Sequence, residues 1–101
     1  MVKINWTNFA LQDLNEIAEF ISKDSIRYAQ MTVKNLFESP SLLKTHPKAG
    51  RVVPEFNDEN FREVIRGSYR IVYRIVDKNR IDILTVHHSA RLIENSLLFK
   101  K

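Results

Sequence analysis

The sequence predicts an α+β domain in which a helical hairpin packs on one face of a four-stranded sheet. Two observations predict it: apolar residues recur every three or four positions in the first half, and β-branched and aromatic residues alternate with polar ones in the second. Each predicted helix has one apolar stripe and the sheet has one apolar face. Packing these surfaces together is therefore the economical architecture, and the other sheet face is expected to stay open to solvent.

The first half is predicted to contain a strand and a helix. Residues 2–6 alternate between apolar and polar side chains, which indicates a first strand. Thr7 is then expected to cap an amphipathic helix of about four turns. The apolar stripe of that helix is Ala10, Leu14, Ile17 and Ile21.

A second helix is predicted to follow after a very short connection. Asp24 or Ser25 can cap it, and its apolar stripe continues to residue 43. Proline lacks an amide hydrogen and clashes with the preceding turn, so the helix must kink or restart at Pro40, with Ser39 as a new cap. The stripe itself is Ala29, Val33, Leu36 and Phe37, followed by Leu42 and Leu43.

The second half is predicted to supply the rest of the sheet. Residues 46–54 indicate a loop that passes into an edge segment, and residues 55–60 an exposed turn. Three antiparallel strands follow, separated by turn residues at 67–68 and 77–79. Residues 92–98 are a candidate for a short C-terminal helix.

The composition indicates one domain, residues 1–101, without a covalent or metal framework. With 101 residues, 44% of them hydrophobic, the chain can build one core but not two. It has no cysteine, so we expect no disulfide, no thiolate nucleophile and no Cys-based metal site. We also predict no cofactor and no bound metal. No apolar run approaches the roughly 20 residues that span a bilayer, and MVKINWTNFA lacks the apolar core of a signal peptide. We therefore expect a cytoplasmic protein without a membrane partner.

Arginine recurs every four residues through the first two strands of the second half, at Arg62, Arg66, Arg70 and Arg74. Side chains alternate faces along a strand, so residues four apart share a face. We therefore predict one basic, open sheet face. The helices are predicted to cover the opposite face of the sheet, which carries the odd-numbered apolar residues Ile65, Tyr69, Ile71, Tyr73 and Ile75.

The charge distribution predicts an anionic partner. The net charge is +4, and every arginine except Arg27 lies in the second half. The guanidinium fork suits phosphate and carboxylate groups, so nucleic acid or an acidic protein segment is expected to bind the basic face. The alternative is an ordinary solvated face, on which Glu63, Asp77 and Asp82 are surface partners of the arginines.

A set of residues spread over almost the whole chain matches a known family in type and order. In the first half these are Trp6-Thr7, Ala10, Asp13-Leu14, Ile17, Ala29, Leu43, Pro47 and Gly50-Arg51. In the second half they are Arg62-Glu63, Gly67, Tyr69-Arg70-Ile71-Val72-Tyr73, Ile83-Leu84 and His87-His88-Ser89-Ala90-Arg91. On these residues the chain resembles the ParE/RelE superfamily of toxins from type II toxin–antitoxin modules.

The resemblance implies a small bacterial protein that is toxic when free and is held inactive by an antitoxin, whose extended tail wraps it. In this superfamily the RelE-like branch cleaves mRNA on the ribosome, and the ParE-like branch poisons DNA gyrase. The Ala-x-x-Asp-Leu pattern at residues 10–14 makes the first half more similar to ParE.

The match to the RelE-like branch is incomplete. That branch combines basic side chains on the sheet with a terminal Tyr or His, which activate the 2′-hydroxyl and stabilise the phosphate. By resemblance, Arg62, Arg70 and Arg91 stand where it has basic residues. The RelE-like branch often has a second lysine on the strand, and this chain has Val64 at that position. That branch also has a C-terminal aromatic acid or base, and this chain has about Leu97 there.

His87 and His88 end the last predicted strand. Adjacent strand residues point to opposite faces, so at most one of them can share the basic face. An unperturbed histidine pKa suits proton transfer, and related ribonuclease toxins use a histidine near this position. The alternative is that one histidine ends the core and the other is solvated. Metal binding is disfavoured because His46 lies in a distant loop.

The leading hypothesis is a plasmid-stabilisation toxin that poisons DNA gyrase by contact, without catalysis, and binds a cognate antitoxin. The first alternative is a ribosome-dependent mRNA endonuclease, with Arg70, His88, Arg91 and His87 as candidate catalytic residues. A second alternative is a non-toxic remnant that only binds antitoxin. In each case an anionic partner or target is expected at Arg62, Arg66, Arg70, Arg74 and Arg91. The oligomeric state is left open.

Overall fold

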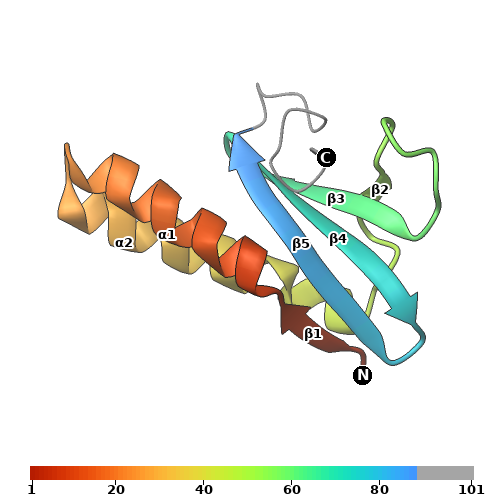
Figure 1. Ribbon diagram of the computed structural model, residues 1–101. Coiled ribbons are helices and arrows are strands. Elements are labelled where there is room, and N and C mark those ends of the chain that lie inside the picture. Colours follow the sequence, from red (N-terminus) through yellow and green to blue (C-terminus); the bar gives the residue numbers. More distant parts are fainter. Residues whose placement is uncertain (89–101) are drawn as a thin grey trace.

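The computed structural model describes residues 1–88 (Figure 1). Arg91, Leu97 and the candidate helix over residues 92–98 lie outside the described residues. The elements are β1 (Lys3–Trp6), α1 (Asn8–Ser22), α2 (Ile26–Glu38), the 3-10 helix η1 (Ser39–Lys44), β2 (Arg51–Val52), β3 (Phe61–Arg66), β4 (Tyr69–Asp77) and β5 (Arg80–His88). Neither α-helix in this part of the chain is long and apolar enough to cross a membrane.

The α+β fold class is confirmed, but the sheet has five strands where four were predicted. Their order is β1-β5-β4-β3-β2, with β1 parallel to β5 and the other pairs antiparallel. The additional strand is β2, which pairs with β3 through only two residues. A segment this short has no periodicity of its own, so the sequence indicated an edge segment but not a strand.

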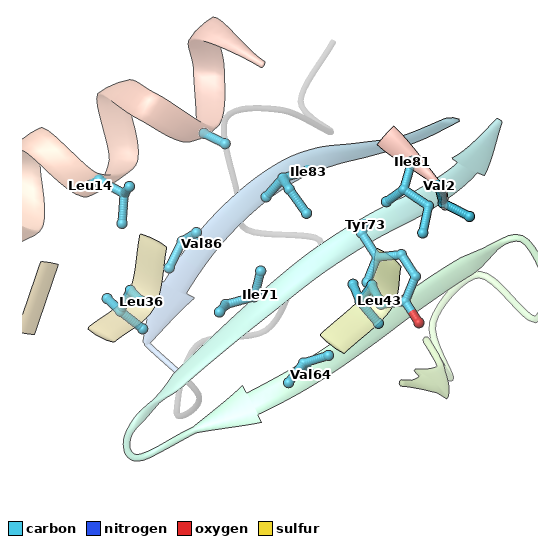
Figure 2. Close-up of a cluster of buried hydrophobic side chains, with 11 residues drawn as sticks. Val2, Leu14, Leu36, Leu43, Val64, Ile71, Tyr73, Ile81, Ile83 and Val86 are labelled. Carbon is cyan, nitrogen blue, oxygen red and sulfur yellow. The ribbon is translucent and has the colours of Figure 1, made fainter. Parts of the chain in front are cut away.

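The helical hairpin packs on one face of the sheet, as predicted (Figure 1). Thr7 and Ser25 cap the helices by accepting bonds from the amides of Ala10 and Tyr28. The restart at η1 differs in detail, because the Ser39 hydroxyl donates back to the Asn35 carbonyl at 2.6 Å instead of capping. Figure 2 shows the buried side chains between the two layers, which include Leu14, Leu36, Leu43, Val64, Ile71, Tyr73, Ile83 and Val86.

The opposite sheet face, predicted to be open, is partly covered by the loop between β2 and β3. Val53 from this loop and Val72 from β4 are fully buried together. Phe56 and Leu84 pack against them. The sheet therefore has a second, smaller apolar cluster on the side away from the helices.

The start of helix α1 contacts the edge of β5 beyond the point where β1 ends and forms hydrogen bonds with it. The Thr7 hydroxyl donates to the Ile83 carbonyl at 2.7 Å. One Asp13 carboxylate oxygen accepts from the Thr85 hydroxyl at 2.5 Å and from the Val86 amide at 3.0 Å. Asp13 lies outside the predicted apolar stripe of this helix. Its carboxylate satisfies polar groups on the part of the β5 edge that has no strand partner within residues 1–88.

The loop before β2 is fixed by Tyr73 and Gly50. The fully buried Tyr73 hydroxyl donates to the Pro47 carbonyl at 2.7 Å and accepts from the Gly50 amide at 3.0 Å. Burial raises the pKa of the Tyr73 phenol, although the bond from Gly50 opposes this shift. A Cβ atom at Gly50 would lie 2.6 Å from the Glu63 carbonyl oxygen and 2.7 Å from the Tyr73 hydroxyl. The contact therefore requires glycine.

We predict that Gly50→Ala lowers the free energy of unfolding by about 1–3 kcal/mol, because the methyl group overpacks this contact. Urea denaturation followed by circular dichroism measures the change. Gly67→Asn is the matched control: Gly67 has φ +57° with nothing within 4 Å of an added Cβ, and asparagine tolerates this conformation. Equal stability of Gly50→Ala and wild type would contradict the close approach.

Candidate functional site

The strand register separates the arginines that the sequence predicted to share one face. In the β3–β4 hairpin, closed by Gly67 and Ser68, Arg62 lies opposite Tyr73, and Arg70 lies opposite Ile65. Directly opposite residues share a face. Arg62 therefore lies on the helix side and Arg70 on the other side. The prediction of a single basic face is therefore wrong. Within each strand the arginines do share a face, but the register places the even-numbered residues of β3 on the same face as the odd-numbered residues of β4.

The same register corrects the predicted apolar face at Ile65, whereas Tyr69, Ile71, Tyr73 and Ile75 lie on the helix side as predicted. Arg66 lies opposite Tyr69 on the helix side, and Arg74 lies opposite Phe61 on the other side. Ile65, predicted to be covered by helices, is 43% exposed on the side away from them, whereas its neighbour Val64 is buried. The arginine set is thus divided into two pairs on opposite faces.

Arg62 holds backbone carbonyl groups. Its Nε donates to the Glu59 carbonyl at 2.8 Å, and its Nη1 donates to the Gly50 carbonyl at 2.9 Å. These bonds connect β3 to the chain on both sides of β2, at Gly50 before it and at Glu59 after it. Arg62 therefore has a structural role that its sequence spacing did not reveal.

Arg70 belongs to an ion-pair network that includes Arg51, Glu63 and Glu55. The Arg70 Nε donates to Glu63 Oε1 at 2.6 Å, and its two terminal nitrogens donate to the Glu55 oxygens at 3.2 and 3.3 Å. The other Glu63 oxygen accepts from Arg51 Nε. The Glu63 side chain is 0% exposed and that of Arg70 only 8%. Two arginines thus compensate one fully buried carboxylate.

The network holds Arg70 in its charged form. Burial lowers the pKa of the Arg70 guanidinium, but the hydrogen bonds to Glu55 and Glu63 outweigh burial and raise the pKa overall. In this arrangement the guanidinium fork is occupied by two carboxylates. Before Arg70 can bind an external anion, one carboxylate must leave.

Arg66 and Arg74 are the exposed members of the predicted set. The Arg74 guanidinium lies 5.8 Å from the centre of the Phe61 ring, a distance typical of a cation–π contact. Arg66 borders a groove between α2 and the β3–β4 turn. These two side chains can meet a partner without breaking an ion pair inside the network.

The two histidines point to opposite faces, as predicted. His87 lies opposite Arg70 and is 6% exposed. His88 is exposed on the helix side, with its ring centre 5.7 Å from that of Tyr69. Arg70 and His88 therefore lie on opposite faces, and His87 is the histidine beside Arg70.

The groove between α2 and the β3–β4 turn has a volume of about 710 Å³. Tyr28 and Met31 on its helix side are 60% and 53% exposed. Sequence reasoning missed this groove because both residues lie off the apolar stripe of α2, although large apolar side chains outside a stripe are a usable signal. Its lining includes Tyr28, Met31, Leu36, Leu42, Tyr69 and Arg66.

Comparison with known proteins identifies the family. Residues 4–93 match the family model described as the ParE toxin of the type II toxin–antitoxin system parDE. No curated protein matches the chain.

Two solved structures share the fold. A chain of the chromosomal ParDE toxin–antitoxin system from P. aeruginosa has a TM-score of 0.70 and 22% identity, covering 87% of this chain and 96% of that one. A chain of the RelBE2 toxin–antitoxin complex from Mycobacterium tuberculosis has a TM-score of 0.56 and 24% identity, covering 86% and 96%. Because the family model spans nearly the whole chain, the protein belongs to the ParE toxin family of type II toxin–antitoxin systems.

Proposed function

We propose that this protein inhibits growth by ParE-like poisoning of DNA gyrase, through protein–protein contact and without catalysis of its own. The match of residues 4–93 to the ParE toxin family carries the proposal. The proposal places the protein in the bacterial cytoplasm, where gyrase acts on DNA. Plasmid stabilisation is the corresponding role of the module.

The geometry of the arginines supports a mechanism without catalysis. Phosphoryl chemistry needs cationic groups and an acid or base aimed at one reacting position. Here Arg62 binds backbone carbonyls, Arg70 binds two carboxylates, and His88 lies on the opposite face from Arg70. Val64, at the position where the RelE-like branch often has lysine, is buried.

A supercoiling assay with purified gyrase and relaxed plasmid tests this proposal. We expect the protein to reduce supercoiling and to trap cleaved DNA, because a poison holds gyrase in its DNA-cleaved state. The control omits gyrase, and cleaved plasmid must then be absent. Unchanged supercoiling at a stoichiometric excess of the protein would contradict the proposal.

One observation favours a second candidate, a ribosome-dependent mRNA endonuclease: His87 lies beside Arg70 on one sheet face. In a ribosome-bound mRNA cleavage assay, Arg70→Gln and His87→Gln are then expected to reduce cleavage by about 10²-fold or more. His88→Gln is the matched control and is expected to retain cleavage, because His88 faces the other side. Full activity of both Arg70→Gln and His87→Gln would remove this candidate, as would the absence of cleavage by wild type.

The proposed protein partner is a cognate antitoxin. The groove beside α2 combines the apolar side chains of Tyr28, Met31 and Tyr69 with the cationic Arg66. This lining suits an amphipathic, partly acidic segment that becomes ordered on binding. Both similar structures come from toxin–antitoxin systems, which supports a partner of this kind.

Arg66→Glu is expected to weaken binding of the cognate antitoxin by about tenfold or more, because it places a like charge against an acidic segment. Lys78→Glu is the matched control, since it makes the same charge change at the turn between β4 and β5, at the other end of β4. Titration calorimetry with the purified antitoxin gives both dissociation constants. Equal weakening by the two variants would indicate a general charge effect and contradict docking in the groove.

A further inference from the structure

The two carboxylates bound to Arg70 differ in how firmly they are held. Glu63 lies on β3, has no exposed side-chain surface, and accepts from Arg70 Nε at 2.6 Å. Glu55 lies on the loop between β2 and β3, is 21% exposed, and accepts at 3.2 and 3.3 Å. Charge-assisted bonds of this type are usually about 2.7–2.9 Å long. The ion pair between Arg70 and Glu55 is therefore weaker than the one between Arg70 and Glu63.

The loop that carries Glu55 is built to move more easily than the strands. Between Val53 and Phe61 every residue is exposed as a whole except the half-buried Phe56, although the Glu55 side chain itself is only 21% exposed. Phe56 is anchored by an edge-on contact with Phe61, with ring centres 5.1 Å apart. Segments with few buried contacts open locally at a lower free-energy cost than the core. Glu55 can therefore leave Arg70 while Glu63 remains in place.

The surroundings of Arg70 indicate which external group would fit. Ile65, directly opposite Arg70 in the hairpin, is 43% exposed and offers an apolar neighbour. The network already holds the buried carboxylate of Glu63, and Asp58 and Glu59 add negative charge to the loop. A phosphate with two negative charges would be repelled more strongly than a single carboxylate. A carboxylate with an adjacent aliphatic side chain matches both features.

We propose that Arg70 is a carboxylate-exchange site, at which Glu55 occupies the position that a Glu or Asp of a bound acidic protein segment takes over. Glu63 keeps Arg70 charged and oriented during the exchange, and Ile65 contacts the apolar part of the segment. The site lies on the opposite sheet face from Arg66 and the groove beside α2. The inference depends on the proposed function only for the identity of the partner, which would be the antitoxin.

Peptide binding followed by NMR tests the exchange independently of gyrase. The probe is a short peptide of alternating leucine and glutamate, and its matched control replaces each glutamate with glutamine. Glu55→Gln removes the internal competitor, so this variant is expected to bind the acidic peptide about five- to tenfold more tightly than wild type. The Arg70 Nε–H resonance must shift during the titration.

Glu59→Gln removes the same charge from the same loop, but the carboxylates that bond to Arg70 are those of Glu55 and Glu63. The Glu59→Gln variant is therefore expected to bind the acidic peptide within about twofold of the wild-type affinity. Glu55→Asp keeps the charge on a shorter side chain and should give an intermediate affinity; it also replaces Glu55→Gln in the test if that variant fails to fold. Equal affinities of the Glu55 and Glu59 variants, or equal binding of the glutamine peptide, would overturn the proposal. Tighter binding of inorganic phosphate than of the peptide would overturn it in favour of a phosphate site.

Discussion

A single buried carboxylate, that of Glu63, holds together the half of the sheet that lies farthest from β1. A buried charge is costly unless it is paired and hydrogen-bonded. Glu63 meets this requirement through Arg51 on β2 and Arg70 on β4, and Arg70 in turn holds Glu55 on the loop. The two-residue strand β2 and its loop are thereby attached to the sheet. Gly50 allows the same region to close tightly against the Glu63 backbone.

This network changes what the arginine-rich hairpin can do. Arg70 is bonded to carboxylates and Arg62 to backbone carbonyls. Both side chains therefore stabilise the fold, and neither is available to a substrate unless one of these bonds breaks. The exposed positions, Arg66 beside the groove and Ile65 on the other face, are better suited to contacts with protein segments. A protein that acts by binding gyrase, and is neutralised by binding an antitoxin, is consistent with this division.

The features that could be predicted from the sequence are those set by local interactions. The caps at Thr7 and Ser25, the apolar stripes and the breakers at 67–68 and 77–79 depend on neighbouring residues. The structure confirms them, except that Phe37 of the second stripe is 50% exposed. Whether Arg62 and Arg70 share a face depends on the register across a turn, which the parity of each separate strand does not determine. The strand β2 and the role of Asp13 depend on partners distant in sequence. The predicted site residues therefore lie in a different arrangement from the one that their spacing indicated.

In the proposed mechanism Arg70 does not contact gyrase: it holds the sheet together through Glu63 and Glu55, and only an acidic segment of the antitoxin replaces Glu55. The decisive measurement is gyrase inhibition by a series of Arg70 variants, each compared with its own free energy of unfolding from urea denaturation. We expect inhibition to follow the fraction of folded protein, so that every variant as stable as wild type inhibits gyrase equally well. An Arg70 variant with wild-type stability and no inhibition would contradict the account, because Arg70 would then act directly on the target.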